Sequence, residues 1–141
     1  MSMRHPKVME WERRLKAVFD QIDRELESRY GNKFLLHPAR AALGSTADPS
    51  ADGLFDLGAA FTAGFGSKLG RGYVVQIRLA TLQDLPANLV QAIEREVLDR
   101  LKEALPRAFP GRTLRVERDG HAYKIVGDLS LTAGIALHNR E

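Results

Sequence analysis

The feature that most restricts the fold is a pair of stretches with alternating apolar residues on either side of a glycine-rich segment. In residues 54–65 the odd positions are apolar, and the even positions are mostly small or polar. Residues 72–81 repeat the alternation, with Tyr73, Val75 and Ile77 on one side. A period of two is typical of half-buried strands, so both stretches are predicted to be β-strands.

The glycine-rich segment, FTAGFGSKLGRGY starting at Phe61, raises the alternative of a phosphate-binding loop. A dinucleotide-binding fingerprint requires a helix after its glycines, whereas a strand pattern follows here. A Walker loop requires a Gly-Lys pair, which the chain lacks. The segment is therefore predicted to be a hairpin loop of five residues between Phe65 and Arg71, with Phe61 opposite Val75. An alternative stays open, in which backbone amides near Lys68 and Arg71 hold an anion.

Apolar residues at three- and four-residue steps predict two amphipathic helices, at 6–30 and 84–108. Pro6 suits the first turn of the first helix, and Gly31 suits a left-handed cap at its end. Asp84 is a candidate N-cap of the second helix. The apolar stripe of the second helix consists of Leu89, Val90, Ile93, Val97, Leu101 and Leu105.

A second hairpin is predicted from TLRVERDGHAYKIV, because its dipeptide Asp119-Gly120 is a type I′ turn sequence. A two-residue loop at that dipeptide places Val116 opposite Tyr123. A further short strand is predicted at residues 33–36.

These elements predict a single α+β domain over residues 1–141. Its order is helix, hairpin, helix, hairpin, and its economical form is a two-layer sandwich. In that form two helices cover one face of an antiparallel sheet of four or five strands. Residues 44–53 are small, polar and rich in turn formers, so they are predicted to be a flexible loop. A short disordered tail is expected at about 133–141.

The composition excludes several classes of site. The 141 residues include no cysteine, which excludes disulfides, thiolate zinc sites and a cysteine nucleophile. The N-terminal sequence lacks the apolar core of a signal peptide, and no stretch approaches the ~20 apolar residues of a membrane span. We therefore expect a cytoplasmic protein that does not enter a membrane.

The net charge of +3 lies entirely in residues 61–141, which carry 12 basic and 9 acidic side chains. On the predicted register, the sheet face turned away from the helices combines small residues with sparse cations. A flat surface of this kind is suited to docking, although it lacks the exposed aromatics that RNA-binding sheets use for stacking. The candidate binding residues on this face and the glycine loop are Lys68, Arg71, Arg78, Arg115 and Lys124.

Two other features are candidate ligand sites. The string DPSADGLFD, from Asp48 to Asp56, matches the first half of an EF-hand loop, but Ala59 occupies the position of the bidentate glutamate. His37 is a candidate base or anion ligand, although a histidine beside a proline commonly caps a bend. The expected interpretation is a turn at both places, so no metal site, cofactor or catalytic residue is predicted.

The resulting functional prediction is a protein-binding or assembly domain without catalytic activity that forms a homodimer. The alternative is a domain that binds nucleic acid or another anionic ligand through the basic residues named above. Such binding would weaken steeply with salt.

Overall fold

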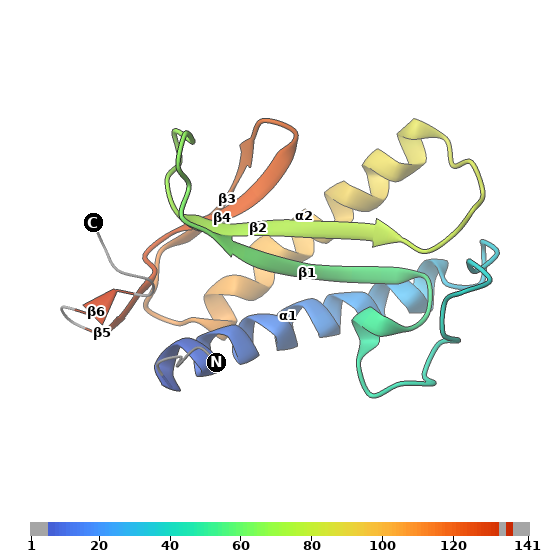
Figure 1. Cartoon of the computed structure of the whole chain (residues 1–141), viewed down its shortest axis with the longest axis horizontal. Coiled ribbons are helices and arrows are strands. Elements are labelled where there is room, and N and C mark those ends of the chain that lie inside the picture. Colours follow the sequence, from blue (N-terminus) through green and yellow to red (C-terminus); the bar gives the residue numbers. More distant parts are fainter. Residues whose placement is uncertain (1–5, 133–134, 137–141) are drawn as a thin grey trace.

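The computed structural model describes residues 6–132, 135 and 136, with side chains described as far as Leu129. Apart from β6, the predicted disordered tail at 133–141 lies outside the described residues. The elements follow one another along the chain in Figure 1 as α1 (Pro6–Tyr30), a short 3-10 helix (Pro49–Ala51), β1 (Phe55–Thr62), β2 (Gly72–Leu79), α2 (Ala87–Ala108), β3 (Leu114–Asp119), β4 (Ala122–Gly127), β5 (Ser130–Thr132) and β6 (Ile135–Ala136).

The predicted α+β class is confirmed, with two helices and an antiparallel sheet of four strands. The strand order is β1-β2-β4-β3, and β5 pairs only with β6 in a separate ribbon. The two hairpins join in the middle of the sheet, where Tyr73 of β2 lies opposite Ile125 of β4. This order leaves β1 and β3 at the two edges of the sheet.

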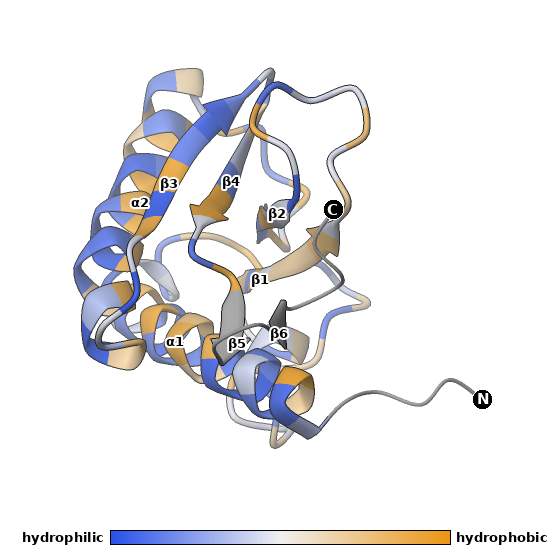
Figure 2. Ribbon diagram, turned by 90° about the vertical axis from the view of Figure 1, so that its left-hand side faces the viewer, coloured by the Kyte–Doolittle hydropathy of each residue, from blue (hydrophilic) through white to orange (hydrophobic). Residues whose placement is uncertain are grey.

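A single core lies between the helices and the sheet. Figure 2 shows α1 and α2 on the same side of the sheet. The core contains the apolar stripe of each helix together with inward side chains of the strands, and its largest fully buried members are Phe19, Ile22, Leu26, Leu54, Phe55, Tyr73, Ile93, Leu101, Leu105, Ile125 and Leu129.

The second helix begins three residues later than predicted. Pro86, with φ −57° and ψ 140°, is its N-cap residue, and no side chain caps it. A residue before proline is disfavoured in the helical region, which explains why Leu85 and Asp84 stay outside the helix. The predicted strand at 33–36 is also absent, because no strand is found there among the described residues.

Both hairpins form, but both predicted registers are wrong by two residues. In the first hairpin Phe61 lies opposite Tyr73, so the loop is residues 63–71 rather than a five-residue turn. In the second hairpin Asp119 is still a strand residue and pairs with Ala122, so the turn lies one residue later than predicted. Val116 therefore lies opposite Ile125. Gly120, with φ 67°, therefore occupies the first central position of the turn, where a positive φ is required.

Candidate functional site

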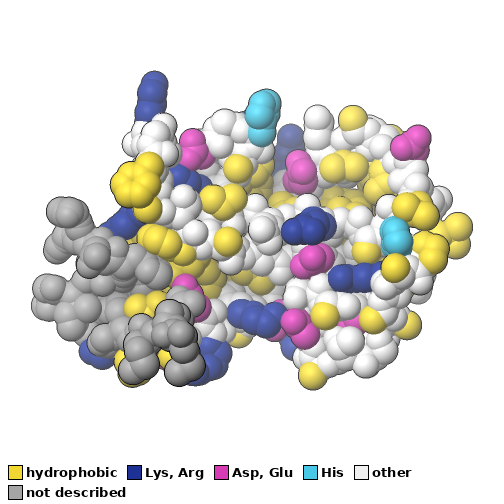
Figure 3. All heavy atoms as spheres, in the orientation of Figure 1, with side chains coloured by type: hydrophobic (Ala, Val, Ile, Leu, Met, Phe, Trp, Pro, Cys, Tyr) yellow, Lys and Arg dark blue, Asp and Glu magenta, His cyan; other side chains and the backbone are white. Residues whose placement is uncertain are grey.

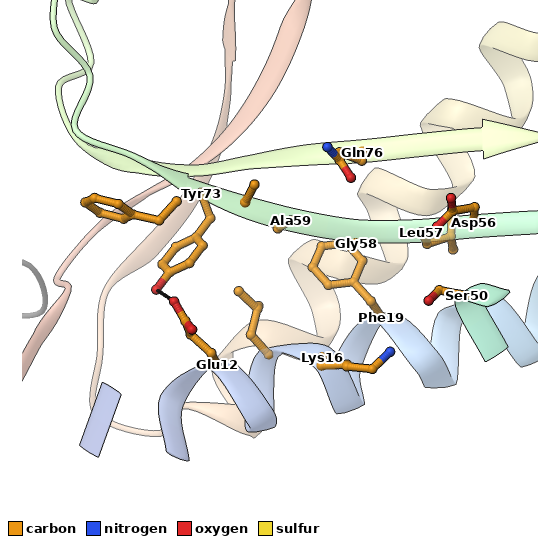
Figure 4. Close-up of a pocket in the computed structure, with 13 residues that line it drawn as sticks. Glu12, Lys16, Phe19, Ser50, Asp56, Leu57, Gly58, Ala59, Tyr73 and Gln76 are labelled. Atoms are coloured by element: carbon orange, nitrogen blue, oxygen red, sulfur yellow. Dashed lines mark hydrogen bonds between the residues drawn. The ribbon is translucent and has the colours of Figure 1, made fainter. Parts of the chain in front are cut away.

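An open groove of about 680 Å³ lies between α1 and β1. Figure 4 shows the helix side chains turned up toward the strand, with Tyr73 at one end and Ser50 at the other. Leu15, Phe19 and Leu57 form its apolar floor. The Tyr73 hydroxyl donates a 2.9 Å hydrogen bond to Glu12 and so fixes one end of the groove.

The strand side of this groove is the free edge of β1. The Ala80 amide donates to the Leu54 carbonyl at 2.7 Å, which continues the ladder between β1 and β2. Backbone groups alternate in direction along a strand, so the even residues of β1 face β2 and the odd residues face outward. The N–H and C=O of Phe55, Leu57 and Ala59 therefore point away from the sheet.

The outward groups of Phe55 are satisfied, whereas those of the next two odd residues are not. The Phe55 amide donates to Glu27 Oε2 at 2.8 Å, and the Phe55 carbonyl accepts from Arg40 at 3.0 Å. No comparable partner of Leu57 or Ala59 is found in the part of the chain that the structure describes. The groove thus contains a length of strand edge able to pair with an extended backbone.

Lys16 carries the positive charge at the Ser50 end of the groove. Its Nζ contacts Asp20 at 3.0 Å and Asp48 at 2.8 Å. The hydrogen bonds from Lys16 and Ser50 lower the pKa of Asp48 to about 2. Lys16 is therefore engaged by two carboxylates of its own chain, and the centre of the groove is apolar.

The five predicted binding residues are not equally placed. Lys68 and Arg78 are exposed, and Arg78 lies opposite Asp56 in the sheet. Arg115 pairs with Glu117 at 2.6 Å, and Arg71 is half-buried. Figure 3 shows basic and acidic side chains interspersed over one described face of the molecule.

Lys124 is only 2% exposed, because the glycine-rich loop folds over it. Its Nζ contacts Asp119 at 2.8 Å, the Gly70 carbonyl at 2.9 Å and Ser67 Oγ at 3.1 Å. Ser67 Oγ in turn donates to Asp119 at 2.7 Å. The loop of the first hairpin is thereby fastened to the end of the second hairpin.

This constellation is suited to holding the loop rather than to nucleophilic catalysis. The Lys124 amine is shared among Asp119, the Gly70 carbonyl and Ser67 Oγ, and the Ser67 hydroxyl donates its proton to Asp119, so both groups are engaged in fastening the loop. Lys124 in turn lowers the pKa of Asp119. The amides of Ser67, Leu69 and Gly70 also donate inside the loop, so they are already used there.

Lys124→Met is expected to lower the free energy of unfolding by about 2 kcal/mol, because three acceptors lose a charged donor. Urea unfolding measures this change. Lys68→Ala, in the same loop but exposed, is the matched control and should stay within ~0.5 kcal/mol of the wild type. Equal effects of the two substitutions would contradict the role assigned to Lys124.

A second cluster of charged side chains lies at the other end of α1. Asp23 is 1% exposed, and neither of its carboxyl oxygens has a hydrogen-bond partner among the residues that the structure describes. Burial, together with the charge of Glu27, raises the pKa of Asp23 to about 8. Burial also raises the pKa of Glu27, whose carboxylate caps the start of β1. Gly53 permits this contact, because a Cβ there would lie 2.4 Å from Glu27 Oε2.

Arg40 and Asp52 organise the segment that leads into β1. Arg40 donates to the carbonyls of Gly53 at 2.9 Å, Ser50 at 2.6 Å, Asp52 at 3.2 Å and Phe55 at 3.0 Å. The Asp52 carboxylate is buried and accepts from the amide and hydroxyl of Thr46. These contacts do not test the flexibility predicted for residues 44–53, which stays a prediction.

In the EF-hand-like string, the two aspartates Asp48 and Asp52 bond to different partners within the chain. Asp48 caps the 3-10 helix by accepting from the Ser50 amide, while Asp52 turns inward to Thr46. No group of three or more potential metal ligands occurs among the described residues. His37 Nδ1 accepts from the Ala39 amide at 3.0 Å, which is the bend-capping role weighed above.

Sequence reasoning missed the edge of β1 and the buried acids. The groove depends on strand order, which periodicity does not reveal. The acids left a signal, because Asp23 and Glu27 lie four residues apart on the apolar face of α1, beside Phe19, Ile22 and Leu26. Acidic residues on a buried helical face require hydrogen-bond partners or a proton.

Comparison with known proteins finds relatives along most of the chain. A family model described as "Uncharacterised protein" matches residues 6–127, which include both helices and the four-stranded sheet. A protein of Borreliella burgdorferi described as "Uncharacterized protein" is 35% identical over 121 residues, which are 86% of this chain and 94% of the relative. No solved structure matches the chain. Within the described residues, no helix is long and apolar enough to cross a membrane.

Proposed function

The chain belongs to the family whose model covers residues 6–127, and we propose that it is a two-layer protein-binding or assembly domain that acts without catalysis. Its binding surface is the groove between α1 and the edge of β1. The observation that carries the proposal is the pair of outward-facing backbone positions, Leu57 and Ala59, along an apolar groove. An extended polypeptide that adds a strand to a sheet edge recognises these groups.

The geometry of the groove suits strand addition. The backbone of an added strand would bond to Leu57 and Ala59, and alternate side chains would point toward Leu15 and Phe19 of the helix. Main-chain bonds would supply affinity, and the apolar floor would select side chains. The groove also remains open beside Gly58, which has no side chain to obstruct a partner.

Proline substitutions test which residues face the edge. Ala59→Pro removes an outward amide that takes no part in the ladder with β2, so it should cost less folding stability than loss of a ladder bond while preventing strand addition. Ala60→Pro is the matched control, because Ala60 faces β2 and lies opposite Val74. It removes a ladder hydrogen bond and leaves its acceptor unpaired, which should cost about 1–3 kcal/mol. Thermal and urea unfolding of both variants measure the difference.

Binding is tested with a phage-displayed library of random dodecapeptides, alongside sedimentation of the protein alone. We expect the wild type either to select extended peptides that shift the amide signals of Leu57 and Ala59 or to self-associate. Ala59→Pro should weaken either interaction at least tenfold. A wild type that does neither, or an Ala59→Pro variant that binds as the wild type does, would overturn the proposed function.

A further inference from the structure

We propose that the strand added to β1 is the β1 of a second copy of the chain, paired antiparallel across a two-fold axis at Gly58. This inference rests on the proposed function, because it names the partner of the same groove. The pairing would join two four-stranded sheets into one continuous sheet. The two grooves would lie on either side of the axis.

The first argument is that the edge of β1 is unprotected. Natural sheets block free edges with charged residues, prolines, bulges or a covering element. From Leu57 to Thr62 the strand reads LGAAFT, with no charge and no proline. The pairing of β1 with β2 is regular over its whole length, without a bulge. An edge of this kind is expected to be covered by another strand.

The second argument is that the available backbone groups fix the register. Phe55 cannot pair with a partner strand, because Glu27 and Arg40 already bond its amide and carbonyl. An axis at Gly58 places Leu57 opposite the partner's Ala59, and Ala59 opposite the partner's Leu57. Each of these pairs can exchange both of its N–H···O=C bonds. The unsatisfied positions of the edge are thereby matched to each other.

The third argument is that this register brings no like charges together. The only charged side chain of β1, Asp56, lies opposite the partner's Ala60 rather than the partner's Asp56. At the axis Gly58 faces the partner's Gly58 in a non-hydrogen-bonded pair, where strands approach most closely. A self-complementary neutral edge favours a second copy over a foreign segment, which would require its own matching sequence.

Single cysteines test the register, because the chain has no native cysteine. Gly58→Cys fits the structure, since no atom lies within 4 Å of a Cβ built there. In the proposed dimer the two introduced cysteines lie about 4.5 Å apart between Cα atoms, within disulfide range. Ala60→Cys is the matched control on the same face, with its two copies roughly 13 Å apart.

We expect the wild type to sediment at twice 15.7 kDa and Ala59→Pro to sediment as a monomer. Mild oxidation should convert most Gly58→Cys protein to a covalent dimer on a non-reducing gel and leave Ala60→Cys uncrosslinked. A monomeric wild type, or a dimer in which Gly58→Cys fails to crosslink, would overturn this inference. Crosslinking of Ala60→Cys as efficient as that of Gly58→Cys would overturn it too.

The experiment separates failure of this inference from failure of the proposed function. If the wild type is monomeric but selects library peptides that Ala59→Pro does not bind, the groove takes a foreign strand and only the dimer is wrong. If the wild type neither dimerises nor selects such peptides, the proposed function is wrong as well.

Discussion

At pH 8, Asp23→Asn is expected to raise the free energy of unfolding by about 4 kcal/mol. The native carboxyl is buried without a hydrogen-bond partner, beside Glu27 and within range of the charge on Asp52. Its pKa rises from 3.8 to about 8 on folding, and each unit corresponds to about 1.4 kcal/mol, so the penalty at pH 8 is roughly 5 kcal/mol. The unpaired amide that asparagine buries in its place costs roughly 1 kcal/mol of that gain. Asparagine keeps the size of the side chain and removes the charge that folding must bury.

The direction of the expected stability change follows from the pH dependence of folding. Between pH 4 and 8 the folded state holds a proton on Asp23 that the unfolded state has lost, so stability falls as the pH rises through this window. Burial raises the pKa of Glu27 and adds to the same trend. In Asp23→Asn the decline should be much shallower.

Urea unfolding at pH 5, 6.5 and 8 measures the effect. Asp84→Asn, an exposed carboxylate outside α2, is the control and should follow the wild-type curve within ~0.5 kcal/mol. An Asp23→Asn curve parallel to that of the wild type would show that the carboxyl finds a partner in solution.

The second large effect is expected for Arg40→Met, which should lower the free energy of unfolding by about 4 kcal/mol. The substitution leaves the carbonyls of Ser50, Asp52, Gly53 and Phe55 without their shared donor. It also removes a positive charge that opposes the raised pKa values of Asp23 and Glu27.

Two comparisons make the Arg40 result specific. Arg40→Lys keeps the charge but loses the planar fork, so about half of the stability should return. Arg24→Met, at an exposed position of α1, should change stability by less than ~0.5 kcal/mol. Amide exchange at Gly53, which donates to the Ala41 carbonyl, should accelerate in Arg40→Met alone. Unchanged exchange there would show that Arg40 does not hold the segment.

Local sequence patterns predicted which residues form helices and strands more accurately than they predicted which residues of paired strands lie opposite each other. The stripe in α1 and the alternation in β1 and β2 each follow from the period of a single element. The hairpin registers do not, because the nine residues at 63–71 are held by Ser67 and Lys124 contacts with residues distant in sequence. Turn chemistry alone favoured a shorter loop.

The candidate site shows the same division. Lys124 was predicted from its strand position to stand on an open surface, and no local signal indicates that a loop more than 50 residues earlier covers it. The groove requires knowing that β1 ends the sheet and that α1 runs beside it. The buried carboxylate of Asp23 interrupts the apolar stripe of α1, which is a local signal that the prediction from sequence did not use.

The fastening of the glycine-rich loop sets an order of events in folding. The first hairpin is local and can close early, whereas the contacts of its loop with Asp119 and Lys124 require the second hairpin. We therefore expect these contacts of the loop to form only after β4 has joined β2.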